Sequence, residues 1–174
     1  NESGQTVQIQ FDGVDATSPS GFICDGSNFT GTVDTTGLSE GAIVLSAILT
    51  DLAGNSATSA GINLTKDVTA PLISSVTPPT ANTYIIGDSL NFTINLDETT
   101  AVTGTPRIQL DLGGFVAFAD YVSGTGTTAL LFSYTVQNGD QDNDGISFGS
   151  SAVDENAGSL ADIAGNSINL NLDA

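Results

Sequence analysis

Two nearly identical segments, DLAGNS beginning at Asp51 and DIAGNS beginning at Asp162, constrain the fold of this chain more than any other feature. They lie 111 positions apart, and each follows a run that can be read as a strand. Each also precedes an alternating segment that ends in Asp, at residues 57–67 and 167–173. Because this spacing matches one immunoglobulin-sized domain, the repeat predicts two similar modules in tandem.

Composition predicts that both modules are built from strands. The chain contains 20 Gly residues and much Thr, Ser, Asn and Val, with little Lys, Arg or Glu. This balance disfavours long helices and favours short strands joined by turns. The predicted fold class is all-β, with two tandem immunoglobulin-like (Ig-like) Greek-key β-sandwich domains.

The boundary between the modules is predicted in the segment KDVTAP, residues 66–71. Pro71 has no N–H to donate to a sheet and pushes Ala70 toward an extended conformation, which suits a linker or the start of an edge strand. We therefore predict a first domain at residues 1–67, a linker at 68–70 and a second domain at 71–174.

Alternation of apolar and polar residues predicts about seven strands in the second domain. The clearest is Ser89–Leu96, which places its four large apolar side chains on one face. The other strands are expected at residues 72–76, 107–112, 116–122, 128–136, 146–148 and 168–172.

The first domain gives fewer strands. They are expected at residues 7–11, 22–24, 29–33, 42–50 and 62–65. Nothing strand-like precedes the first of these, so the domain is expected to lack its first strand. Either the chain is a fragment cut after that strand, or a preceding segment or another chain supplies it by β-strand addition.

The charge of the chain points to cations as partners. It carries 20 acidic residues against Lys66 and Arg107 alone, a formal net charge of -18. Such a chain repels nucleic acid and anionic lipid, and no stretch approaches the roughly 20 apolar residues of a membrane span. We expect no nucleic-acid partner and no direct membrane insertion. An acidic surface that serves solubility alone is the other explanation.

The sequence contains few of the residue types that commonly perform catalysis. His is absent, which removes Ser-His-Asp triads and most zinc sites, and two basic residues offer little to hold an oxyanion. Trp is also absent, so the usual platform for stacking sugars is missing. Cys24 is the single cysteine, which excludes an intrachain disulfide. We expect that the chain is not an enzyme.

Residues 37–71, GLSEGAIVLSAILTDLAGNSATSAGINLTKDVTAP, resemble the end of an Ig-like repeat from large bacterial surface adhesins. The second domain resembles a related module of these proteins, whereas residues 1–36 resemble the family only loosely. The matching segments are YIIGDSLNFTINLDETTAVTGTPRIQL, ADYVSGTGTTALLFSYTV, NGDQDNDGISF and LADIAGN. The resemblance implies secreted cell-surface stalks of tandem sandwiches, often stiffened by calcium at the junctions. It also implies that neighbouring Ig-like repeats are the direct partners, and that other domains bind a host or surface glycan or protein.

Acidic residues are expected to gather at the junction of the two domains. In an Ig-like sandwich, the DIAGN turn and the loop after Ser89–Leu96 lie at the pole that faces the linker. The candidate ligands there are Asp67, Asp97, Glu98, Asp162 and Asn166, with Asp34 and Glu40 of the first domain completing the shell. All offer oxygen atoms, which suits Ca²⁺. Turn chemistry is the alternative role of the Asp162 turn, because Asp and Asn side chains bond to nearby backbone there.

A second acidic cluster, GDQDNDG, contains Asp140, Asp142 and Asp144. Alternate Asp residues followed by Gly allow a loop to curl around one Ca²⁺ ion, here at the pole that faces the next domain. An EF-hand is not expected, because Ser151 stands where its bidentate Glu would be; a solvated hairpin is the alternative.

Three aromatic residues are candidates for ligand contact: Tyr84, Tyr121 and Tyr134. Tyr134 alternates with a Phe and is expected in the core, and Tyr121 is expected at a sandwich edge. No ligand groove can be placed from the sequence.

These observations together predict a stalk or spacer segment of a bacterial surface adhesin, stiffened by Ca²⁺ at the domain junction. Two alternatives remain open. One is a glycan- or protein-binding module or an accessory domain of a secreted enzyme. The other is a polymer-forming subunit that receives its first strand from another chain.

Overall fold

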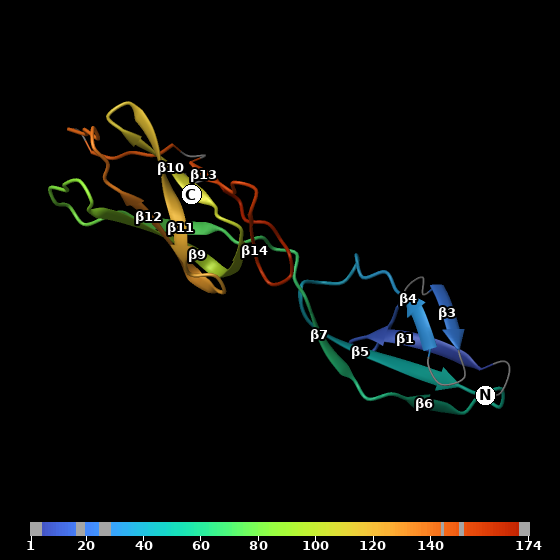
Figure 1. The fold of residues 1–174 in the computed structure, drawn as a ribbon. Helices are drawn as coiled ribbons and strands as arrows, with labels where there is room; N and C mark the ends of the chain where they lie inside the picture. The colour runs from blue at the N-terminus through green and yellow to red at the C-terminus, as the bar shows by residue number, and fades with distance from the viewer. Residues whose placement is uncertain (1–4, 17–19, 25–28, 144, 150–151, 171–174) are drawn as a thin grey trace. The chain divides into compact units, whose positions relative to one another are not determined.

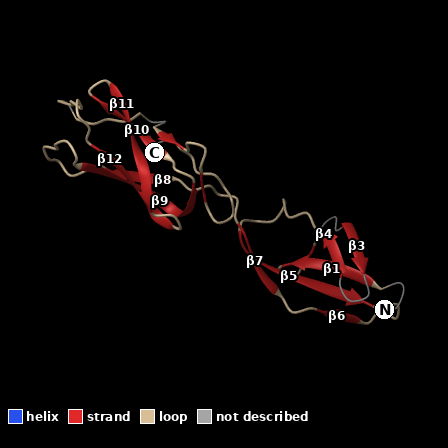
Figure 2. Cartoon of the chain, viewed as in Figure 1, coloured by secondary structure: helices blue, strands red, loops and turns tan. Residues whose placement is uncertain are grey.

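The computed structural model describes residues 5–16, 20–24, 29–143, 145–149 and 152–170. Every regular element in these residues is a β-strand, as Figure 2 shows. The predicted all-β class is therefore confirmed. Within the same residues there is no helix long and apolar enough to cross a membrane. The chain divides into two compact units, Asn1–Val68 and Thr69–Ala174.

The sheet of the first unit is centred on β5 (Gly41–Thr50), a ten-residue strand of mainly apolar and β-branched residues (Figure 1). On one side β5 pairs with β1 (Thr6–Phe11), and β1 pairs in turn with β2 (Val14–Asp15). On the other side β6 (Ser56–Thr58) and β7 (Ile62–Lys66) pair with successive halves of β5. All of these pairs are antiparallel, so local turns can connect most of them.

A separate hairpin in this unit joins β3 (Ser20–Cys24) to β4 (Phe29–Thr32). The buried hydrophobic residues that the structure describes here are Phe11 and Ile43, each 7% exposed. Ile62 shares the Ile43 face of the sheet yet is 58% exposed. The described core of the first unit is thus small.

The alternating segment at residues 57–67 is not the continuous strand that its pattern predicts. It is divided between β6 and β7, because Ser59 leaves the regular pattern and its Oγ accepts a hydrogen bond of 3.0 Å from the Ala47 N–H. Gly61 follows, and a Cβ there would lie 2.7 Å from the Val44 side chain.

The second unit has a seven-stranded sheet. Its strands run in the spatial order β13-β10-β11-β12-β9-β14, and β8 also pairs with β9. Figure 2 labels β8 beside β9. The elements are β8 (Ile73–Thr77), β9 (Ser89–Thr103), β10 (Arg107–Leu112), β11 (Phe115–Ser123), β12 (Thr127–Thr135), β13 (Val153–Asp154) and β14 (Ser159–Ala161).

The core of the second unit follows the predicted period of two along β9. Leu90, Phe92 and Ile94 are 1–2% exposed, and Phe92 lies directly across from the fully buried Phe132 of β12. Each such side chain contributes about 1.5–3 kcal/mol by leaving water. Ile108 and nine further buried residues from various strands and loops join these four in one cluster, so this unit buries far more apolar residues than the described part of the first.

Two strands predicted in the second unit are wrong. Residues 146–148 make only an isolated bridge from Ser147 to Asp111, and the described part of 168–172 follows a single bridge from Ser167 to Ala161. Gly145, with a φ of 102°, precedes the first of these segments and Gly149 follows it, so the segment is too short to extend a ladder. The strands found instead are β13 and β14, in a stretch where no alternation was recognised.

The predicted loop after Leu96 is also wrong, because β9 continues to Thr103. The continuation is rich in Thr and Val, which favour strands. The pairing with β12 becomes irregular there: Asn95 faces Ala129 and Thr100 faces Thr127, so residues 96–99 face the single residue Thr128. Asp97 and Glu98 therefore lie in a bulge of a long strand rather than in a loop.

Candidate metal site

The two DxAGN turns have the same set of internal hydrogen bonds. In the first, the Asp51 carboxylate accepts bonds from the backbone and side-chain nitrogens of Asn55, at 2.8 and 2.9 Å. In the second, the Asp162 carboxylate accepts the same two bonds from Asn166, both at 2.8 Å. In each turn the Asp N–H also donates to the Asn carbonyl. The turn chemistry expected of these residues is thus present in both copies.

Glycine completes each turn, because the chain there adopts a positive φ. Gly54 has a φ of 88° and Gly165 a φ of 94°. Their N–H groups donate to the carbonyls of Asp51 and Asp162 respectively. A residue with a side chain is strained in this conformation, so the Gly-Asn pair is a local requirement of the turn.

The two Asp residues differ in their surroundings. Asp162 is 5% exposed, whereas Asp51 is only half-buried. The second turn is flanked by the buried residues Leu160 and Ile168, which bond to each other through Ile168 N–H and Leu160 C=O. Leu160 and Ile168 thus anchor the second turn to the core of its unit.

Hydrogen bonding keeps both carboxylates ionised. Burial of Asp162 opposes its ionisation, but bonds from Asn166 and from the two N–H groups before it outweigh burial and hold the pKa below its usual value. The pKa of Asp51 is lowered by its bonds from the side chain and backbone of Asn55. Asp162 is therefore a buried, oriented negative charge at neutral pH.

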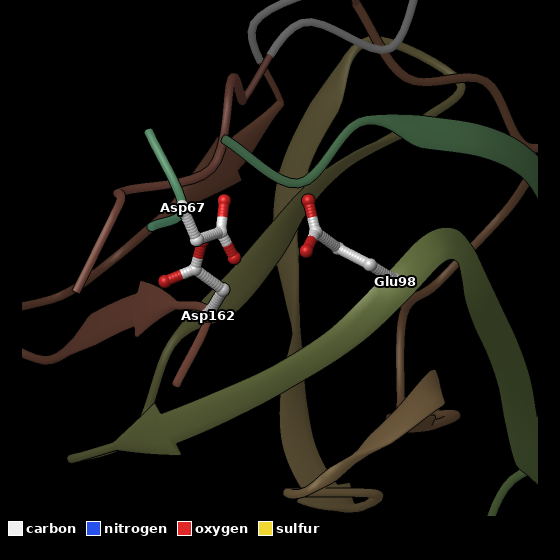
Figure 3. Close-up of side chains that lie close together, drawn as sticks. All are labelled: Asp67, Glu98 and Asp162. Atoms are coloured by element: carbon white, nitrogen blue, oxygen red, sulfur yellow. The ribbon is translucent and has the colours of Figure 1, made fainter. Parts of the chain in front are cut away.

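Three carboxylates meet at Asp162. The structure brings one carboxylate oxygen each of Asp67, Glu98 and Asp162 within 4.8 Å of one another. Figure 3 shows these three side chains close together. Asp67 belongs to the segment between β7 and β8, and Glu98 projects from the bulge of β9. Two negative charges about 4 Å apart repel by about 1 kcal/mol even in water, and a cation between them reverses the sign of that term. The ligand atoms are all oxygens, which favours a hard cation.

Asp97 and Asn166 were expected to join this group, and each has another role. Asp97 exchanges two bonds with Leu72: its Oδ1 accepts the Leu72 N–H at 2.8 Å, and its own N–H donates to the Leu72 carbonyl at 3.1 Å. It thereby fixes the chain just before β8. Asn166 donates its side-chain nitrogen to Asp162, and so orients that carboxylate.

Asp34 and Glu40, two candidates from the first unit, make other hydrogen bonds within that unit. Asp34 accepts bonds from the Thr36 N–H and hydroxyl, which together with nearby Lys66 lower its pKa. Glu40 accepts a bond of 3.3 Å from the Val68 N–H. Lys66 donates to three carbonyl groups of the same loop, among them that of Leu38 at 2.7 Å. Neither acid belongs to the three-carboxylate cluster.

The second acidic cluster also stabilises its own loop. Asp140 accepts bonds from the Tyr134 hydroxyl at 2.8 Å and the Gln137 N–H at 2.7 Å. Asp142 accepts the Gly145 N–H at 2.8 Å. Asp144 lies outside the described residues. Burial and the bond to Asp140 raise the pKa of Tyr134 to about 12, so its phenol remains a hydrogen-bond donor.

The ion pair between Arg107 and Asp154 was not predicted from the sequence. Arg107 forms an ion pair with Asp154 at 2.8 Å and lies 4.0 Å over the ring of Phe118. Because β10 pairs with both β11 and β13, this contact depends on strand order, which the local pattern does not reveal.

Comparison of the sequence with family models and with curated proteins found no match for this chain.

Proposed function

We propose that this chain is a spacer segment of a secreted bacterial surface adhesin, in which bound Ca²⁺ stiffens the connection between tandem domains. The observation that supports this most is the meeting of Asp67, Glu98 and Asp162 within 4.8 Å. The resemblance to adhesin repeats supports the setting at the cell surface, with neighbouring Ig-like repeats as partners.

The donor set fits a calcium ion. Three carboxylates present up to six oxygen atoms, and Ca²⁺ takes about six to eight, the remainder from water or backbone carbonyls. With no His and one Cys in the chain, ligands for softer metals are scarce. A bound divalent cation supplies the positive charge that offsets the repulsion among the three acids.

The residues of the chain prepare this site in different ways. Asn166 holds the Asp162 carboxylate through two bonds of 2.8 Å, and the β9 bulge directs Glu98 out of the regular ladder. Asp67 lies on the connecting segment, six residues before Ile73 begins β8. Ligation of all three would tether this segment to the second unit and restrict its rotation.

Thermal melting during a calcium titration tests the proposal. A ligand bound only by the native state stabilises it by RT ln(1 + [L]/Kd), about 1.4 kcal/mol at tenfold excess over Kd. For a domain of this size, that raises Tm by about 5–10 °C. Mg²⁺ should act less, because it needs a more regular octahedral shell. An unchanged Tm in millimolar Ca²⁺ would contradict the cation site.

Substitution of Glu98 should change Tm in opposite directions without and with Ca²⁺, which a loss of local packing would not do. In EDTA, Glu98→Gln removes like-charge repulsion of about 1 kcal/mol and should raise Tm slightly. In Ca²⁺, the same variant should melt below the wild type. Glu155→Gln is the matched control, since the Glu155 side chain lies outside the cluster and accepts a hydrogen bond from the Leu160 N–H. Equal behaviour of the two variants would reject a role for Glu98.

Solution scattering tests the stiffening separately. Calcium should narrow the distribution of interatomic distances in the wild type and leave that of Glu98→Gln unchanged. Calcium binding without this narrowing would leave a cation site that does not act as a stiffener, and the spacer mechanism would be wrong.

A further inference from the structure

The second unit contains a cavity of about 460 Å³ that shares no residue with the three-carboxylate cluster. Its volume is within the range of about 300–1,000 Å³ that is usual for sites of small ligands. It lies between the segment before β9 and the segment after β12, and its inner wall includes Phe92 of the core.

Local chemistry keeps this space open. The consecutive prolines at 78 and 79 cannot donate to a sheet, so the chain leaves the ladder at the end of β8. The hydroxyl of Tyr84 then donates to the Thr80 carbonyl at 2.6 Å and holds the segment as a closed loop. On the opposite side, Phe148 packs edge-on against Phe92, with ring centroids 6.4 Å apart. The wall is therefore largely apolar and aromatic, and the hydrogen bond and the ring contact hold it in position.

The charge in the cavity is of one sign. Asp140 and Asp142 line it, and each is oriented by the bonds described above. The only two basic residues of the chain are absent from its lining. The Tyr134 hydroxyl donates to the Asp140 carboxylate and fixes its position at the cavity wall. Aromatic faces and carboxylates both attract a cation, and their combination disfavours an anion.

We propose that this cavity binds a small organic cation, an ammonium group on an aromatic or aliphatic body. The apolar body would lie against the partly exposed side chains of Tyr84, Ile146 and Phe148, and the ammonium group would lie beside Asp140 and Asp142. Such a site goes beyond the spacer role and is independent of calcium, because the two sets of residues are separate.

Three probes of nearly the same shape test the charge preference: 2-phenylethylammonium, 2-phenylethanol and phenylacetate. Binding is measured by calorimetry and by NMR shifts of the full chain at 150 mM salt, where exposed charges are largely screened. The ammonium compound should bind at least about tenfold more tightly than the alcohol, and phenylacetate should not bind measurably. Binding of the alcohol as tight as that of the ammonium, or no binding by any probe, would overturn the proposal.

Matched charge removal distinguishes the cavity from the general acidity of the chain. Asp142→Asn keeps an oxygen for the Gly145 N–H but removes the charge, and should weaken the ammonium about tenfold while leaving the alcohol unchanged. Asp120→Asn changes the net charge equally on an exposed position of β11 outside the cavity, and should have no effect. Asp140→Asn provides a second variant if Asp142→Asn melts early. Equal weakening by the control at Asp120 would show that binding is nonspecific.

Discussion

The two DxAGN turns share their hydrogen bonds but differ in what surrounds them. The Asp51 turn is only partly covered, whereas the Asp162 turn is anchored between the buried residues Leu160 and Ile168. Of the two turn Asp residues, only Asp162 belongs to the three-acid group found in the described part of the chain. The same hexapeptide pattern thus specifies a turn in both places, and the neighbours decide whether its carboxylate can contribute to a cation site.

Substitution of the turn glycine should destabilise the two turns equally. It should cost more stability than the other substitutions in these turns. Gly54→Ala and Gly165→Ala each force a side chain into a positive φ, which costs about 1–2 kcal/mol, although nothing within 4 Å would touch the new Cβ. Gly37→Ala and Gly149→Ala are the matched controls, since neither has a positive φ in the left-handed range or a near neighbour. Thermal melting measures the difference. A loss in one turn only would show that the two turns are not equivalent in conformation.

Replacement of the turn asparagine should destabilise the two turns to different extents. Asn166→Ala removes a side-chain donor from a carboxylate that is 5% exposed, where water cannot replace it fully. Asn55→Ala removes the same donor from the more accessible Asp51. We expect Asn166→Ala to lower the Tm of its unit by about 4–8 °C more than Asn55→Ala lowers that of the first. Equal losses would mean that burial of Asp162 has no energetic consequence.

The sequence predicted those features that depend on local pattern. The alternation in Ser89–Leu96 placed Leu90, Phe92 and Ile94 on the buried face, and the structure confirms it. It did not reveal that β9 continues through Glu98, because the bulge there depends on its pairing with β12. The cavity beside Tyr84 was also missed, since it depends on how two distant loops pack.

Three acids of the cluster were among the predicted ligands, although no local signal separated them from the rest. Asp97 adjoins Glu98 in sequence, yet its side chain turns to the Leu72 N–H, because neighbouring residues of a strand point in different directions. Asp34 bonds within its own loop, and Glu40 accepts the N–H of Val68 in the segment between β7 and β8. The bond of Asp97 to Leu72 and that of Glu40 to Val68 join residues 25 and 28 positions apart, so a local sequence pattern cannot predict them.

Acid titration should change the stability of both turns by a smaller amount, and the pKa shifts of Asp51 and Asp162 predict the direction of that change. The pKa values of Asp51 and Asp162 are both lowered in the folded chain. Each therefore contributes stability that is fully present above the unfolded value of about 3.9 and is lost as the pH falls through the lower folded value. In EDTA, Asp51→Asn and Asp162→Asn should melt below the wild type at pH 6, and the gaps should narrow below about pH 4 as the wild-type carboxyl groups become protonated. In Ca²⁺ the gap for Asp162→Asn should widen at pH 6 and that for Asp51→Asn should not, because only the second carboxylate lies beside Asp67 and Glu98. Gaps that stay constant with pH would mean that the two variants act through turn geometry alone, and equal widening in Ca²⁺ would place the cation elsewhere.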